Sequence, residues 1–181
     1  MDALFPVALR EVCSRMPLLL ILTCLAGPVV TVDAQVVEEA DGSIPVKFRV
    51  VVHSTNWESL DVGDVTGHIL AVGGFKGLAF FEGEVATASE VSIFDKTNGR
   101  GSAEGYVLFT FDDGATQVIA IQGEDVPTQE GGSVFDGSYS YTRGSGRFEG
   151  IKGSGTFTGQ FYIDVQSGYS AFTGSYTLPG S

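Results

Sequence analysis

The sequence predicts an all-β domain, and we expect its strands to form a closed eight-stranded antiparallel β-barrel. After residue 43 no stretch of a dozen residues has the 3.6-residue apolar spacing of an amphipathic helix, whereas apolar and polar residues alternate in eight segments. Short turns rich in glycine, aspartate and asparagine separate these segments, as is typical of antiparallel hairpins. A closed barrel removes the exposed edges that an open sheet would leave, so we prefer it over the alternative, a two-sheet sandwich.

The predicted strands are bounded by turn signals. Residues 97–99 (Thr-Asn-Gly) and residues 112–114 (Asp-Asp-Gly) predict hairpin turns, and residues 166–168 close the last pair of strands. Gly73-Gly74 predicts a bend or bulge before the third strand. The predicted strands are residues 46–54, 65–72, 78–88, 102–111, 115–123, 134–142, 156–165 and 169–178, and residues 91–94 either extend the third or form a short extra piece.

Glycine and phenylalanine recur together in the last part of the chain. The pattern GSGxFxG occupies residues 144–150 and again residues 153–159, and the shorter FxG occupies residues 135–137 and 172–174. The unequal spacing excludes a repeat of fixed period. We expect the glycines to let the chain turn or let strands approach closely, while the phenylalanine side chains fill the core. Residues 144–153 are therefore predicted to form a tight connection.

The first residues have the pattern of a cleaved signal peptide. Arg10 and Arg15 precede an apolar run at residues 18–25, and a small-residue cleavage site ends at Ala34. We therefore expect a secreted or periplasmic protein that is cleaved after Ala34. The apolar run is too short for a comfortable membrane span, so we expect no stable span in the mature form. The predicted organisation is a signal peptide at residues 1–34, a flexible acidic leader at 35–45 and one barrel domain at 46–181.

Composition excludes several classes of function. The net charge of −12 predicts a surface that repels nucleic acid and anionic membranes, so we expect no nucleic-acid partner. Both cysteines, Cys13 and Cys24, lie in the predicted signal peptide, which leaves no thiol for nucleophilic chemistry or metal binding. The two histidines, His53 and His68, lack the spacing of a zinc site. We expect neither a metal nor a cofactor.

Two residues are candidates for catalysis. Glu82 shares its alternating face with Leu78 and Phe80, so we expect it to point into the barrel, where burial would raise the pKa of its carboxyl and suit it to general acid–base chemistry. The alternative is that Glu82 lies in solvent at a strand end. His68 shares a face with Leu70 and is the second candidate, the alternative being a hydrogen-bonded structural histidine.

Four aromatic residues are candidates for ligand binding. Tyr139 and Tyr141 share a face beside the glycine motif and would offer hydroxyl groups to a ligand, unless they serve only as wall residues. Tyr106 is a third phenol, although Val107 and the residues on the opposite face form the larger apolar side. Trp57 follows the first strand and would rim the mouth of the barrel, or else anchor a loop. An eight-stranded barrel has an interior just wide enough to be filled by side chains or to hold one small ligand.

Residues 139–159, YSYTRGSGRFEGIKGSGTFTG, and residues 105–123, GYVLFTFDDGATQVIAIQG, resemble the allene oxide cyclase barrel-like group. This group includes allene oxide cyclases, dirigent proteins and many bacterial proteins of undefined role, and the resemblance covers roughly residues 64–178. It implies a calycin-type barrel with an apolar cavity, a floor capped by residues 144–150, and a dimer or trimer. The cyclases are isomerases that close a ring in a lipid epoxide, and dirigent proteins steer radical coupling. The first strand lacks the early glutamate of the cyclases, so the resemblance transfers no catalytic residue.

Two classes of function follow. In the first, an exported barrel binds a small apolar molecule and templates its cyclisation or isomerisation through its shape, which needs positioning more than reactive side chains. In the second, the protein is a non-enzymatic carrier, or a packed structural barrel that acts through protein–protein contacts. The volume and polarity of the interior distinguish these hypotheses. A filled interior would exclude a ligand, and a cavity with an inward Glu82 or His68 would favour chemistry.

Overall fold

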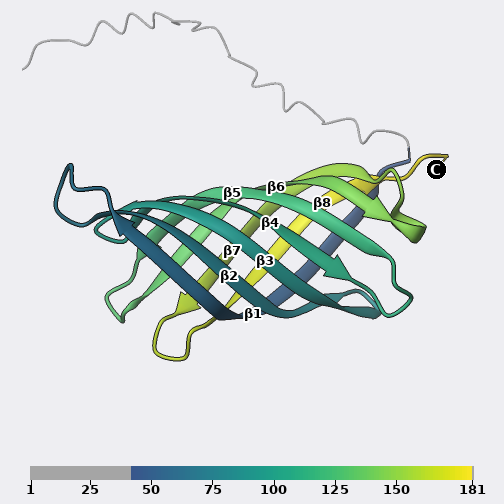
Figure 1. Cartoon of the computed structure of the whole chain (residues 1–181). Helices are drawn as coiled ribbons and strands as arrows, with labels where there is room; N and C mark the ends of the chain where they lie inside the picture. Colours follow the sequence, from purple (N-terminus) through teal and green to yellow (C-terminus); the bar gives the residue numbers. More distant parts are fainter. Residues whose placement is uncertain (1–41, 181) are drawn as a thin grey trace, which may run out of the picture. The chain divides into compact units, whose positions relative to one another are not determined.

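The computed structural model describes residues 42–180, which form a closed antiparallel β-barrel (Figure 1). The predicted all-β fold with eight strands is confirmed, and the two-sheet sandwich is excluded. Each strand pairs with its neighbours in sequence, and β8 pairs with β1, so the sheet has no free edge. The elements are β1 (Ile44–Asp61), β2 (His68–Phe81), β3 (Glu84–Thr97), β4 (Arg100–Thr110), β5 (Thr116–Pro127), β6 (Gly132–Ser145), the short 3₁₀ helix η1 (Gly146–Phe148), β7 (Lys152–Tyr162) and β8 (Ser167–Thr177).

The β2–β3 hairpin differs most from the predicted strands. β2 continues through Gly73-Gly74 as a paired strand, and the bulge lies opposite, in β1, between Ser54 and Asn56. A Cβ atom on Gly74 would lie 2.0 Å from the side-chain oxygen of Asn56, so this glycine accommodates the bulge of its partner strand. The hairpin turn falls instead at Glu82-Gly83, inside the segment predicted as the third strand. Residues 91–94 consequently lie in the second half of β3.

Two other predicted turns are confirmed. Asn98 and Gly99 both have positive φ angles, 53° and 80°, which is the backbone that a two-residue hairpin with matching twist requires. At the β4–β5 turn, Gly114 donates a backbone hydrogen bond to Phe111, and the carboxylate of Asp113 accepts one from the backbone of Ala115. The β3–β4 and β4–β5 connections are therefore tight hairpin turns.

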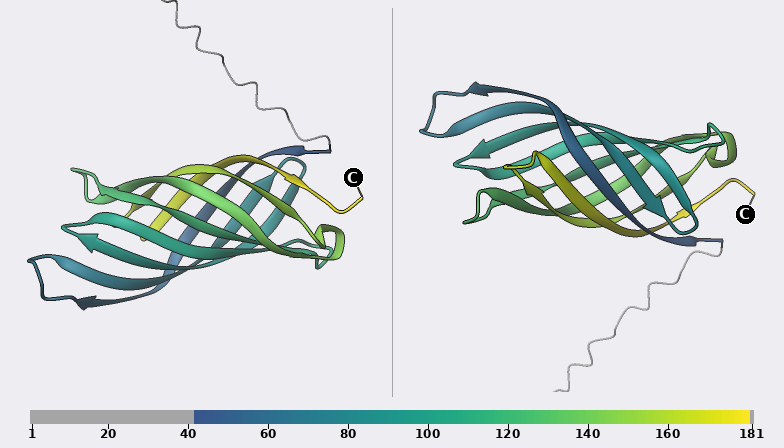
Figure 2. Two further views of the ribbon diagram at one scale, coloured as in Figure 1. Left: turned by 90° about the horizontal axis from the view of Figure 1, so that it is seen from above. Right: turned by 90° about the horizontal axis from the view of Figure 1, so that it is seen from below.

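The connection between β6 and β7 closes one end of the barrel. Phe148 of η1 is buried against Phe111, with 4.9 Å between the ring centroids. Arg147 lies over both rings and forms ion pairs with Glu84, the first residue of β3, and with Asp113 in the β4–β5 connection. Figure 2 shows η1 at the end of the barrel from which the C-terminal strand emerges. The tight connection expected at residues 144–153 is confirmed, and we call this end the closed end.

Aromatic rings fill the half of the barrel next to the closed end. Phe48 stacks on Phe81 and Phe172 at centroid distances of 4.6 and 4.5 Å, and Phe109 packs edge-on at 5.5 Å. Small residues face these rings from the neighbouring walls, since Ala79 on β2 and Ala86 and Ala88 on β3 occupy inward positions. The interior of this half is therefore packed by large and small side chains from opposite walls.

Late glycines make room for inward aromatic rings, as the sequence predicted. Phe135 on β6 pairs with Gly159 on β7, and a Cβ atom on Gly159 would lie 2.3 Å from the ring of Phe135. Tyr139 covers Gly155 on the same two strands, at 2.6 Å from the position of the absent Cβ. Each ring occupies the space that a side chain on the paired strand would take.

The predicted signal peptide and residues 35–41 of the predicted leader lie outside the described residues. Ile44 and Pro45, expected at the end of the leader, already belong to β1 and pair with β8. Between residues 42 and 180 there is no helix of the length and hydropathy that a membrane span requires.

Candidate functional site

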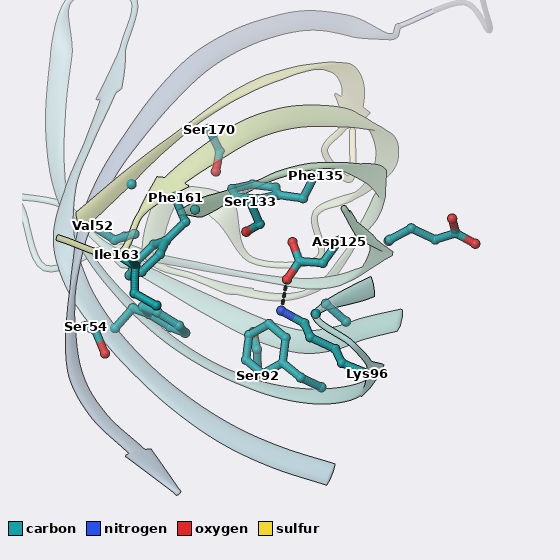
Figure 3. Close-up of a pocket in the computed structure, with 18 of the residues that line it drawn as sticks. Val52, Ser54, Ser92, Lys96, Asp125, Ser133, Phe135, Phe161, Ile163 and Ser170 are labelled. Carbon is teal, nitrogen blue, oxygen red and sulfur yellow. Dashed lines mark hydrogen bonds and ion pairs between the residues drawn. The ribbon is translucent and has the colours of Figure 1, made fainter. Parts of the chain in front are cut away.

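The half of the barrel opposite the closed end contains a cavity of about 600 Å³ (Figure 3). All eight strands contribute to its lining, together with residues of the β3–β4, β5–β6 and β7–β8 connections. Phe157 and Phe172 belong both to the lining and to the packed core, so they form the floor. Pockets that bind small molecules usually measure about 300–1,000 Å³. The barrel is thus half filled and half hollow.

Aromatic rings form much of the cavity wall. Phe75 packs edge-on against Phe94 at 6.3 Å and against Phe161 at 5.9 Å between ring centroids. Trp57 lies 4.9 Å from Phe94 and is 45% exposed, so it stands at the rim. Such a wall would bury the apolar body of a ligand.

One side of this apolar wall carries a cluster of polar groups, which we call the polar cluster: Glu90, Ser92, Lys96 and Asp125. Three of its members occupy alternate inward positions on β3, and the fourth faces them from β5. Ser92 is fully buried and donates a 2.7 Å hydrogen bond to Glu90. Gly105 on β4 pairs with Ser92 on β3, and the absence of a Cβ atom on this glycine leaves space for the serine hydroxyl.

Lys96 and Asp125 form an ion pair across the interior, drawn as a dashed line in Figure 3. Their side chains are only 11% and 6% exposed. The ammonium group of Lys96 also lies 4.5 Å from the ring centre of Phe94 and 5.9 Å from that of Trp57. A buried charge needs such partners, because an unpaired one would bear a large desolvation penalty.

Glu90 has a different environment from Asp125. Its remaining exposed surface faces the cavity, and among the described residues no basic side chain forms an ion pair with it. Burial raises the pKa of the Glu90 carboxyl, against the opposing effect of the Ser92 hydrogen bond, and the negative charge of Asp125 raises it further. Glu90 is therefore an inward carboxyl with an altered proton affinity, which is a common property of functional groups.

The expectation that Glu82 points into the barrel is wrong. Glu82 lies in the β2–β3 turn, where it is exposed and borders a smaller cleft of about 340 Å³ at the closed end. The face of β2 that carries Leu78 and Phe80 is the outer one, because both side chains are 44% exposed. The inner face of β2 carries Ala79 and Phe81 instead. Glu82 thus lies at the closed end, whereas the polar cluster lies in the other half of the barrel.

His68 lies on the outside of β2, beside the connection between β1 and β2. Its Nδ1 atom lies 2.6 Å from Asp64 and its Nε2 atom 2.8 Å from Asp95. These hydrogen bonds, first that of Asp64 and then that of Asp95, raise the pKa of the imidazole. The hydrogen bond between His68 and Asp64 also lowers the pKa of the Asp64 carboxyl. This geometry corresponds to the structural alternative, and His68 does not line the cavity.

The predicted ligand-binding aromatics separate into three places. Tyr139 and Tyr141 point inward but lie in the packed core, where burial raises the pKa of both phenols. Their hydroxyl groups have no hydrogen-bond partner among the described residues. Tyr106 is 61% exposed on the outer face of β4, contrary to the expectation that it would contact a ligand. Trp57 lines the cavity, so it is the one member of the predicted set that the structure brings to the polar cluster.

No group of three or more His, Cys, Asp and Glu side chains between residues 42 and 180 is arranged to hold a metal ion. Comparisons with known proteins found no protein-family model, no curated protein and no solved structure that matches the chain.

Proposed function

We propose that this protein is an exported barrel that binds one small, mostly apolar molecule in the cavity of the half opposite the closed end. The observation that carries the proposal is the cavity of about 600 Å³, lined by aromatic rings, in a barrel whose other half is packed. A structural barrel has no need of such a hollow, since unfilled space forfeits packing energy. The cavity therefore favours a ligand-binding barrel over a packed one.

The test is the titration of the protein with N-phenyl-1-naphthylamine, an uncharged apolar dye whose fluorescence increases in apolar surroundings. We expect one dye molecule per barrel. Ala103 points into the cavity from β4, and an Ala103→Phe substitution would fill part of it. Ser102 is the adjacent, exposed residue, so Ser102→Phe adds the same ring outside. Loss of dye binding in the first variant alone supports the proposal, and equal binding in both variants contradicts it.

Native mass spectrometry of the protein from its own host would identify a natural ligand. A small apolar molecule that co-purifies at one per barrel supports a ligand site, and the measured N-terminus tests export and cleavage after Ala34. The same spectra test the predicted dimer or trimer. Exposed apolar side chains on the outside of β2, β3 and β4 would favour such an assembly; they include Leu70, Val72, Leu78, Phe80, Val85, Val91, Ile93 and Leu108.

A second candidate is catalysis of cyclisation or isomerisation in the same cavity, and Glu90 favours it. Burial raises the pKa of the Glu90 carboxyl, and a carboxyl with a raised pKa in an apolar site is suited to general acid–base catalysis. Once a ligand is known, its conversion by wild type and by Glu90→Gln separates an enzyme from a carrier. Catalysis predicts turnover that Glu90→Gln abolishes even when the variant is saturated with ligand, and absence of turnover in the wild type leaves the carrier.

A further inference from the structure

The ionisable side chains that line the cavity are unevenly balanced. Among the residues of its lining, three ionisable side chains occupy inward positions, two acids and one lysine: Glu90, Asp125 and Lys96. The lysine already forms an ion pair with Asp125, so its charge is neutralised inside the protein. Glu124 and Asp136 pair with each other across β5 and β6, but they are exposed and alternate with the inward Asp125 and Phe135, so they lie on the outer face of this wall. An anionic ligand would therefore meet no unpaired cation in the lining.

Glu90 is the acid in the lining that could serve a ligand from inside the barrel. It faces the cavity from the middle of β3, and the hydrogen bond from Ser92 fixes one of its oxygen atoms. A carboxylate accepts several hydrogen bonds, so the group retains capacity for a donor from the ligand. A positively charged donor would satisfy this carboxylate in an interior where an isolated charge is costly.

The aromatic wall is also suited to a cation. The ammonium group of Lys96 lies over the faces of Phe94 and Trp57, which shows that these rings accept a positive charge at 4.5 and 5.9 Å. Phe75 packs against Phe94 and extends this wall to the position of Glu90, with which it pairs across β2 and β3. Aromatic rings next to a carboxylate are the usual means by which proteins recognise organic ammonium groups.

We propose that the cavity selects an apolar molecule that carries a protonated amine, with the ammonium group against Glu90 and the apolar body among Phe75, Phe94 and Phe161. This inference rests on the proposed ligand-binding function and specifies its ligand class. The raised pKa of Glu90 agrees with it, because burial disfavours the charged carboxylate and a positive charge beside it would offset that cost. An ammonium group bound there would form an ion pair with the ionised carboxylate.

The experiment compares three ligands with the same ten-carbon chain: decylamine, decanol and decanoate. Each is titrated below its micelle concentration at pH 7, and binding is followed by the fluorescence of Trp57, the only tryptophan in the chain. We expect decylamine to bind at least about tenfold more tightly than decanol, and decanoate to bind most weakly. Glu90→Gln should lower the affinity for decylamine much more than the affinity for decanol, and so reduce the advantage of the amine over the alcohol.

The control is Glu104→Gln, which removes the same charge from the exposed outer face of β4. If general attraction to an acidic protein caused the preference, both variants would reduce it equally, and the proposal would be overturned. Equal or tighter binding of decanoate to the wild type would also overturn it, and this comparison needs no variant to fold. Binding of decanol without preference for the amine leaves the ligand-binding function intact, whereas failure of all three ligands to bind contradicts that function itself.

Discussion

Replacing Phe148 with alanine tests whether η1 closes the barrel by packing rather than by chain connectivity alone. Phe148 is 7% exposed, and its ring packs on Phe111 beneath the guanidinium group of Arg147. The substitution keeps the glycines on either side, so the connection can still form its turn. What it removes is the side chain that separates the core from solvent at the closed end.

The expected loss follows from the burial of the ring. A phenylalanine side chain buries roughly 150–250 Å², and at about 25 cal/mol per Å² the transfer contribution is ~4–6 kcal/mol. Measured Phe→Ala substitutions in protein cores cost about 3–5 kcal/mol. Loss of the contact with the half-exposed Arg147 adds about 0.5–1 kcal/mol. We therefore expect the free energy of unfolding to fall by about 4 kcal/mol.

Urea denaturation followed by far-UV circular dichroism measures this change, and Phe80→Ala is the matched control. Phe80 lies on the outer face of β2 near the same end and is 44% exposed, so its removal should cost about 2 kcal/mol or less. Equal losses in the two variants would refute the reasoning, because burial at the closed end would then contribute nothing specific. Phe148→Ala should also keep its dye binding under native conditions, since the cavity lies in the other half.

Three further predictions concern single side chains. The raised pKa of His68 means that its stabilising contribution is fully present below about pH 6.5 and is lost as the pH rises through its higher folded-state pKa; His68→Gln should therefore flatten the fall in melting temperature above pH 6.5. The folded-state pKa of Glu90 is also raised, but Glu90 is an acid, so its ionisation at higher pH destabilises the folded state. Wild type should therefore lose stability relative to Glu90→Gln as the pH rises from about 4.5 to the folded-state pKa, and melting curves of both proteins across this range measure the difference. Gly159→Ala would place a Cβ atom 2.3 Å from the ring of Phe135, and we expect a loss of about 1–3 kcal/mol in urea denaturation, which an unchanged midpoint would contradict.

The number of strands, the antiparallel order and several turns could be predicted because they depend on local chemistry. Asn98-Gly99 can adopt two successive positive φ angles, which few other residue pairs allow. The glycine and phenylalanine pattern of the last strands likewise reports a physical need, since Phe135 requires an opposing residue without a side chain. Such signals act over a few residues or across one strand pair.

The orientation of β2 could not be predicted from apolar character. The larger residues Leu78 and Phe80 lie outside, whereas the inward positions next to them are Gly77 and Ala79. Phe48 on β1 explains this inversion, because its ring and those stacked on it occupy the space in front of β2. Small residues on one wall complement large residues on another, and this complementarity is a property of the closed barrel rather than of one strand.

The inversion also explains why sequence reasoning missed Glu90. On β3 the outward positions Val91 and Ile93 are apolar and more than half exposed, while the inward positions next to them are Glu90 and Ser92. Reasoning from hydrophobicity would turn the wrong face of such a strand inward, and its orientation is fixed by its pairing with β2 and β4 in the closed barrel. One signal was present in the sequence. Residues 90, 92 and 96 are polar and lie on the same face of the strand as Phe94, whereas a face that points to solvent does not need a large aromatic side chain. Polar residues that share a face with a buried aromatic ring indicate an interior that is built to contact something other than the protein itself.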